Sequence, residues 1–134
     1  MLRVISPLDD DTEKCIDEAM DCAFAVHRAI GPGYGESIYK NAFCVELLAR
    51  NIPFECEKSF VIRHRDRPVG THRLDLIVRG RVVVELKAVK MLKRVHEAQV
   101  LAYLKASTLP VALLMNFGGA TLKEGLKRVI MPRI

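Results

Sequence analysis

The stretch RLDLIVRGRVVVELK, residues 73–87, decides the fold that we expect for this chain. Two apolar runs rich in β-branched residues, residues 69–78 and 82–89, flank Gly80. Such runs are typical of β-strands, and the gap between them is too short for the crossover that parallel strands need. We therefore expect a tight β-hairpin that supplies the central strands of a sheet.

Two helices are expected before this hairpin. Apolar residues recur at helical spacing from residue 12 to residue 30, and Gly31-Pro32 ends the pattern. A second helix is expected over residues 36–50. Its apolar stripe, which should face the core, is formed by Ile38, Ala42, Val45 and either Leu48 or Ala49.

The remaining elements surround the hairpin. Alternating residues predict a strand over residues 54–62, and a helix over residues 92–107 and a buried strand over residues 111–117 follow the hairpin. Residues 122–130 fit a short edge strand or a helical turn. The expected order is α-α-β-β-β-α-β with a short last element, which makes an α/β fold with a mixed β-sheet flanked by helices.

The length and net charge of the chain limit the kinds of protein that it can be. The 134 residues leave room for one core, so we expect a single domain over residues 1–134. The 21 Lys+Arg against 16 Asp+Glu give a formal net charge of +5, which favours polyanionic partners such as nucleic acid. Because no apolar run is long enough for a bilayer span or a signal peptide, we expect no membrane association and a cytoplasmic location.

The four cysteines give no clear sign of a metal site. They form neither a CxxC pair nor a Cys/His cluster at zinc-finger spacing. We interpret them as reduced thiols in the core, and a metal-ligand role is the alternative. The residues concerned are Cys15, Cys22, Cys44 and Cys56.

Three charges interrupt the apolar central strands: Asp75, Glu85 and Lys87. If the hairpin is centred on Gly80, Asp75 and Glu85 lie opposite each other, since each is five residues from the centre. Lys87 shares the face of Glu85 through the two-residue period of a strand, whereas His72 has the opposite parity to Asp75 and should point away. Two carboxylates and one ammonium are therefore expected to converge.

This convergence suggests a cation site. Opposed carboxylates destabilise a hairpin unless a cation compensates them, and either Lys87 or a metal ion could do so. Asp75, Glu85 and the main-chain carbonyl of Leu86 form an oxygen-only set that suits Mg²⁺ or Mn²⁺, which would activate water for attack on a phosphodiester while Lys87 assists. The alternative is an exposed hairpin face with a cross-strand salt bridge and no function.

The helix over residues 92–107 adds polar groups that could meet a phosphate. His96, Gln99 and Tyr103 share one face beside the strand that carries Lys87, although His96 could equally be an exposed surface residue. Two basic runs could neutralise phosphates near a metal site, or could simply be solvated surface. They are Lys90, Lys93 and Arg94 in one run and Arg63, Arg65 and Arg67 in the other.

Taken together, these motifs resemble the GxxExxY proteins, a minimal branch of the PD-(D/E)XK nuclease superfamily. Leu74-Asp75 stands where the superfamily's name has Pro-Asp, which leaves the acidic ligand in place. The matching residues are Gly33, Glu36 and Tyr39 of the naming motif, Asp75 with Glu85-Leu86-Lys87, Gln99 with Tyr103, and Asn116-Phe117-Gly118.

The resemblance implies a restriction-endonuclease-like fold and a metal-dependent nuclease, a hydrolase whose expected substrate is DNA, with RNA as the alternative. It implies that Asp75 and Glu85 bind Mg²⁺ or Mn²⁺, that Lys87 serves catalysis and that Glu36 supplies a further acidic group. Gln99 and Tyr103 would support the site or contact the DNA backbone. For Glu36 the alternative is a carboxylate that favours a helix N-terminus, and for Tyr39, which could contact the ligand, it is packing.

Two other functions remain open. One is a nucleic-acid-binding module that keeps the fold without catalysis, and the other is a protein-interaction domain whose charged cluster is structural. With no second domain for target selection, a homodimer or a protein partner is also expected.

Overall fold

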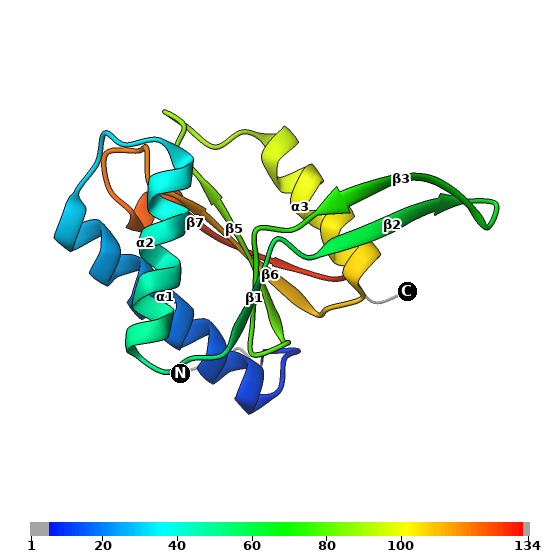
Figure 1. The fold of residues 1–134 in the computed structure, drawn as a ribbon, viewed down its shortest axis with the longest axis horizontal. Coiled ribbons are helices and arrows are strands. Elements are labelled where there is room, and N and C mark those ends of the chain that lie inside the picture. The colour runs from blue at the N-terminus through cyan, green and yellow to red at the C-terminus, as the bar shows by residue number, and fades with distance from the viewer. Residues whose placement is uncertain (1–5, 133–134) are drawn as a thin grey trace, which may run out of the picture.

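The structure is a computed structural model that describes residues 6–132, and Figure 1 shows its mixed α/β architecture. The α/β class and the mixed sheet flanked by helices are confirmed. In chain order the elements are α1 (Asp10–Ile30), α2 (Glu36–Ala49), β1 (Phe54–Cys56), β2 (Ser59–His64), β3 (Arg67–Arg73), β4 (Leu76–Val78), β5 (Val82–Lys87), α3 (Arg94–Ser107), β6 (Val111–Asn116), a 3-10 turn (Lys123–Gly125) and β7 (Leu126–Ile130).

Within the described residues, five strands form the central sheet, in the order β1-β4-β5-β6-β7. β5 and β6 pair in parallel, so the chain between them must cross over, and α3 makes that crossover. The other neighbours pair antiparallel. Residues 122–130, for which the sequence allowed either an edge strand or a helical turn, contain both. A short 3-10 turn is followed by an edge strand that pairs with β6.

The strands expected over residues 54–62 and 69–78 are each broken in two, yet they pair with each other as one long ribbon. Glu57 N donates to Asp75 O and Leu74 N donates to Lys58 O, so the ladder continues through both breaks. Glu57 has a left-handed φ of 53°, which turns the chain at that point. The inner part, β1 and β4, therefore stays in the central sheet, while β2 and β3 leave it as a separate two-stranded sheet.

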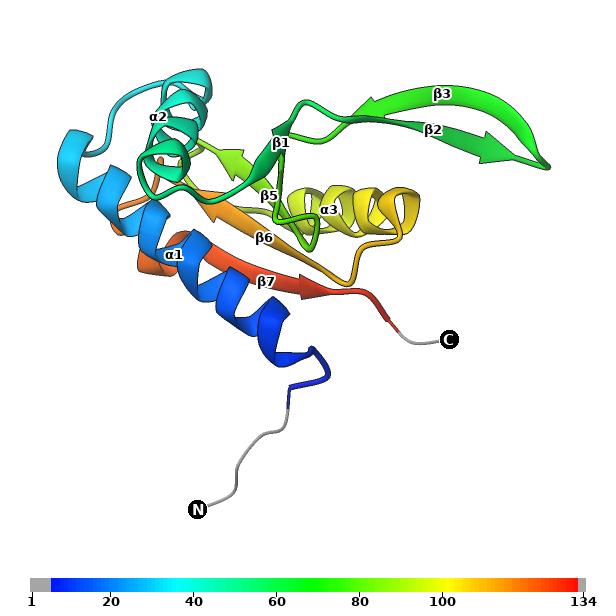
Figure 2. The same ribbon diagram turned by 60° about the horizontal axis from the view of Figure 1, so that its bottom comes forward.

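This outer part, residues 59–73, is called the arm, and it projects from the body past α3 (Figures 1 and 2). Arg65 and Asp66 make the turn at its tip with φ values of 48° and 63°. The register shifts between Ile62 and Arg63, which marks a β-bulge that increases the twist of the ribbon.

Helices α1 and α2 cover one face of the sheet and bury its larger core (Figure 2). The buried face of α2 consists of Tyr39, Phe43 and Leu47, whereas three residues of the expected stripe are exposed, namely Ile38, Val45 and Leu48. The expected stripe is therefore wrong. Both sets have helical spacing, and the set with the two large aromatic rings fills the core.

Helix α3 covers the opposite face, where Val100 and Leu104 pack on the sheet. The sheet residues on this side include Ile77, Val83 and Leu114. Because side chains alternate along β5, Glu85 lies on the same face as Val83, which is the face of α3. Asp75, at the break before β4, lies beside it, since its backbone N–H donates to Glu85 Oε1.

Asn116, at the end of β6, fixes the segment that follows β5. Its buried amide accepts from Val89 N at 3.0 Å and donates to Val89 O at 2.9 Å. Gly118 is needed beside it, since a Cβ there would lie 2.5 Å from the Val89 carbonyl oxygen. These contacts hold the chain directly after Lys87.

Candidate active site

The central hairpin has the register that its sequence predicts. Leu76 pairs with Val84 and Val78 with Val82, so the turn contains the three residues 79–81 and is centred on Gly80. Asp75 N donates to Glu85 Oε1 at 3.0 Å, and Leu86 N donates to Asp75 Oδ2 at 3.1 Å. Asp75 and Glu85, called the acidic pair, therefore bind each other's strand through reciprocal hydrogen bonds.

Glu85 is held in its protonated form to an unusually high pH. Its side chain is buried, with 4% of the residue exposed. Burial, and after it the charge of Asp75, raises the pKa of Glu85 to about 8. The site therefore resists a second negative charge unless a cation enters.

The acidic pair fits a divalent cation by its chemistry. The backbone hydrogen bonds occupy one oxygen of each carboxylate and leave Glu85 Oε2 and Asp75 Oδ1 outside the hairpin, the latter 3.7 Å from the Lys40 ammonium. Hard oxygen donors of this kind suit Mg²⁺ or Mn²⁺, which keep several waters besides one or two carboxylates. Within residues 6–132, no three His, Cys, Asp or Glu side chains lie close enough together to form a larger metal cluster.

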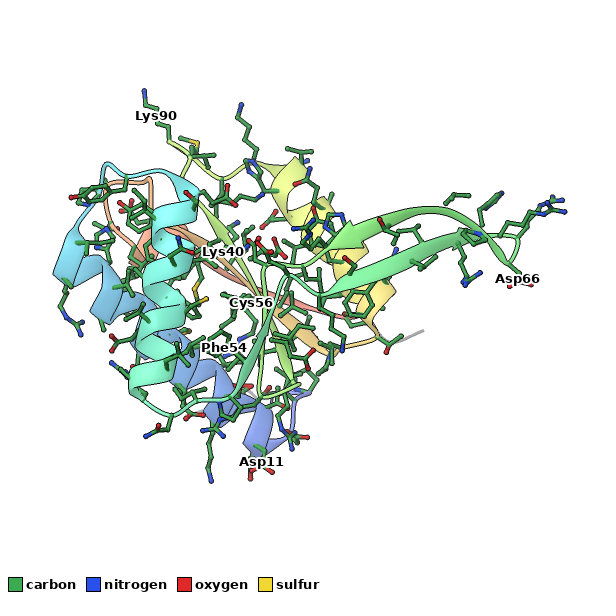
Figure 3. The ribbon with its side chains drawn as sticks, viewed as in Figure 1. Asp11, Lys40, Phe54, Cys56, Asp66 and Lys90 are labelled. Atoms are coloured by element: carbon green, nitrogen blue, oxygen red, sulfur yellow. The ribbon has the colours of Figure 1, made fainter. Side chains whose placement is uncertain are left out.

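Lys40 of α2 is the residue that sequence analysis missed. Its Nζ lies 2.9 Å from Glu57 Oε1 and 3.7 Å from Asp75 Oδ1. Burial opposes its charge, but the hydrogen bond to Glu57 and the charge of Asp75 prevail and raise the pKa of Lys40. In Figure 3, Lys40 is labelled on the side of α2 that faces β1.

The position of Lys40 follows from the true orientation of α2. Because Tyr39 is buried, the next residue points along the edge of the sheet toward Asp75. Lys40 also lies one helical turn after Glu36, which was expected to face the site. That spacing is the only signal in the sequence that could have found it.

Lys87 is half-buried at the end of β5. Its charge opposes the rise in the pKa of Glu85 and lowers the pKa of His72, so it acts on both residues. Among the described residues it forms no ion pair, and the cation beside Asp75 is instead Lys40. The ammonium of Lys87 therefore remains available to an incoming anion.

Tyr103 and His72 form a stacked pair beside the acids, with ring centroids 3.7 Å apart and planes at 16°. Burial and then the charges of Glu85 and Asp75 raise the pKa of Tyr103. Burial lowers the pKa of His72, and Asp75 opposes that change. The prediction that His72 points away from the carboxylates is wrong, because the break at Leu74-Asp75 interrupts the strand alternation on which it rested.

Two predicted contact residues have structural roles. Tyr39 is fully buried, donates its hydroxyl hydrogen to Gly31 O at 2.6 Å and stacks on Phe117 with centroids 4.7 Å apart. Contact between Tyr39 and a ligand is therefore excluded by burial, and the packing alternative is right. His96 Nδ1 accepts from Lys93 N at 2.8 Å and so caps the start of α3.

The other predicted residues lie on the surface around the site. Glu36 is exposed in the first turn of α2, and the structure does not bring it into a cluster with the acidic pair. Gln99 is exposed on α3. The segment between β5 and the first turn of α3 carries three exposed cations, and none forms an ion pair with residues 6–132: Lys90, Lys93 and Arg94.

The cysteines do not all belong to the core. Cys15 and Cys22 are buried, as expected, but Cys44 is half-buried and Cys56 is exposed. The Sγ atoms of Cys44 and Cys56 lie 3.6 Å apart, between α2 and β1. The interpretation of four core thiols is therefore wrong for these two residues.

The acidic pair on the α3 face of a mixed sheet, with Lys87 at the end of the same hairpin, defines a class of protein. The chain belongs to the PD-(D/E)XK nuclease superfamily, whose family model matches residues 13–129. The architecture is consistent with the restriction-endonuclease-like fold of that class.

Two further comparisons give no match, since neither a curated protein nor a solved structure is significantly similar to the chain. Within residues 6–132, no helix combines the length and apolar character that a bilayer crossing needs.

Proposed function

We propose that this protein is a metal-dependent nuclease of the GxxExxY branch, which hydrolyses the phosphodiester bonds of nucleic acid, with DNA as the proposed substrate. The observation that carries the proposal is the pair of reciprocal hydrogen bonds that Asp75 and Glu85 form, together with the raised pKa of Glu85, which disfavours its ionisation unless a cation binds. A purely structural salt bridge would pair each acid with a cation, whereas Glu85 is buried against another acid.

In this proposal Asp75 Oδ1, Glu85 Oε2 and the Leu86 carbonyl hold Mg²⁺ or Mn²⁺. When bound, the metal supplies Lewis acidity and a more acidic water. Lys87 binds the phosphate that is attacked and stabilises the charge that develops on its oxygens. Lys40, whose Nζ lies 3.7 Å from Asp75 Oδ1, orients that carboxylate.

The surrounding surface supports a phosphate-rich substrate. The three exposed cations Lys90, Lys93 and Arg94 neutralise backbone phosphates in a way that ignores sequence. Gln99 contacts the backbone from α3, and Tyr103 supports the site beside the acids. A homodimer or protein partner for target selection, and a cytoplasmic location, remain predictions.

The test is cleavage of DNA and RNA substrates with Mg²⁺, Mn²⁺ or EDTA. Wild type and Lys87→Ala are purified in parallel, and Lys123→Ala, an exposed lysine in the turn before β7, is the matched control. We expect cleavage by wild type and by the control, none in EDTA, and a large loss in Lys87→Ala. Wild type that binds nucleic acid but cuts no better than Lys87→Ala would be a binding module instead.

A further inference from the structure

A groove runs between the arm and α3, next to the acidic pair. Its volume is about 550 Å³, and it is called the strand groove here. Sites of roughly 300–1,000 Å³ are typical for ligands of nucleotide size. The lining residues are Val61, Ile62 and Arg63 of β2, His72 of β3, and Ala102, Tyr103, Lys105 and Ala106 of α3.

The walls of the strand groove combine apolar and aromatic surface. Val61 is 48% exposed and Ile62 is 37% exposed, and small alanines on α3 leave space opposite them. Tyr103, already stacked on His72, supplies an aromatic wall. Flat π-systems such as nucleobases bind to surfaces of this kind without regard to sequence.

The rim of the groove is positive. Arg63 and Lys105 line it, and Arg65 and Arg67 follow at the tip of the arm, which Asp66 marks in Figure 3. None of these four cations forms an ion pair in the part of the chain that the structure describes. Free cations beside an apolar floor are complementary to a strand whose bases and phosphates lie on different sides.

The strand groove adjoins the acidic pair along the chain. His72, which lines it, lies three residues before Asp75, and Leu74 between them belongs to the same buried cluster as Leu104 of α3 and Val83 of β5. Tyr103, the other ring of the stacked pair, lines the groove from α3. A chain that lay in the groove would therefore pass next to the carboxylates.

We propose that the strand groove binds one or two unpaired nucleotides of the nucleic acid whose phosphodiester lies at the acidic pair. The groove is too small to enclose both strands of a duplex, so the segment it takes is a single strand: an end, a flap or a loop. This assignment rests on the proposed function for the position of the phosphodiester, but the binding itself does not depend on cleavage.

The test measures binding without turnover. Fluorescence anisotropy in EDTA compares a labelled oligothymidine with a blunt duplex of the same length, for wild type, Ala102→Glu and Ala102→Gln. Ala102 is exposed on α3, so both variants should fold, and the two side chains differ in charge but hardly in size. Ala29→Glu, on an exposed position of α1 across the sheet, makes the same change in net charge and is the control.

We expect Ala102→Glu to weaken binding of the single strand by about tenfold or more, through repulsion of phosphate and loss of space. Ala102→Gln should weaken it less, and Ala29→Glu should stay within about twofold. Replacing Arg63 and Lys105 together by alanine should reduce the slope of log K against log salt by about 1.4, since each phosphate contact contributes about 0.7 for a single strand. Lys105→Gln, also at an exposed position, changes the net charge by the same one unit as Ala29→Glu and repeats the test if Ala102→Glu fails to fold.

Equal binding by Ala102→Glu and Ala29→Glu would overturn the proposal, even if the protein proves to be a nuclease. Equal affinity for the duplex, with the same sensitivity to Ala102→Glu, would overturn the assignment to an unpaired strand. A selective loss in Ala102→Glu together with no cleavage by wild type on any substrate would keep the groove and reject the proposed function.

Discussion

The two faces of the central sheet are filled in different ways. Within residues 6–132, the face under α1 and α2 belongs to a core cluster of twenty buried residues, whereas the cluster under α3 has seven. Strand β5 serves both: Val84 and Leu86 point into the larger core, and Glu85 and Lys87 point to the other side. One face specifies the fold, and the other leaves space for charged groups.

This difference teaches where to look for function in a buried strand. A strand covered by helices on both faces is ordinarily apolar throughout. Here the apolar character of β5 is interrupted on one face alone, first by Glu85 and then by Lys87. Because burying an unneeded carboxylate costs stability, its presence indicates a site rather than a packing choice.

The largest expected effect is on turnover at the α3 face. Lys87→Ala should lower the rate of metal-dependent cleavage by about 10²-fold or more, because stabilisation of the transition-state charge is lost. The free energy of unfolding should change little, since Lys87 is half-buried and packs in neither core cluster. Single-turnover kinetics and urea unfolding on the same preparation check both parts. A parallel loss of stability would place Lys87 in the structure rather than in the reaction.

Replacements in α2 test the apolar face. Leu47→Ala removes a fully buried side chain and should cost about 2–5 kcal/mol of the free energy of unfolding. Leu48→Ala, its neighbour, is 66% exposed and should stay within about 0.5 kcal/mol. Urea denaturation compares the two. A larger cost for Leu48→Ala than for Leu47→Ala would contradict this orientation of α2 and support the stripe predicted from the sequence.

A substitution at Gly118 tests whether the segment that follows β5 is held by its close contact with this glycine. Gly118→Ala should cost about 1–3 kcal/mol, because its Cβ would lie 2.5 Å from the Val89 carbonyl oxygen. Gly70→Ala in the arm meets no atom within 4 Å and is the matched control. Thermal unfolding measures both variants. Unchanged stability of Gly118→Ala would show that the segment after Lys87 is not held there.

The smallest expected effect is a pH dependence of stability without metal. The folded pKa of Glu85, about 8, exceeds its ordinary value of 4.5, so the folded protein binds this proton more tightly. Its contribution to stability is present below pH 4.5 and is lost as the pH rises through about 8. In EDTA, wild type should therefore lose stability relative to Glu85→Gln over this window, and Mg²⁺ should restore it. Parallel melting curves for the two proteins would contradict this.

The hairpin shows what the sequence can predict of the fold. Its odd-numbered turn and its two apolar runs determine the pairing of Asp75 with Glu85, and the structure has that register. The breaks in the longer ribbon could not be predicted, because Glu57 adopts a left-handed φ that its residue type does not favour. The stripe of α2 was misread because two faces of that helix are apolar.

The candidate site divides in a similar way. Residues on one hairpin could be placed together from strand periodicity alone, as Asp75 and Glu85 were. Lys40 and His72 approach them through the packing of α2 and through the break before β4, which are tertiary effects. Tyr39 carries a motif position but lies in the core, so a motif indicates the family without fixing the role of each residue.

Calorimetric titration of Mg²⁺ and Mn²⁺ into wild type and Asp75→Asn tests the central claim, that the acidic pair on the α3 face is a divalent-cation site. An amide oxygen at this position can still accept from Leu86 N, so the hairpin should be preserved. We expect saturable binding to wild type and a large loss of affinity in Asp75→Asn, with no comparable loss in Glu124→Gln, an exposed acid in the turn before β7. Equal affinity in all three proteins would contradict the account.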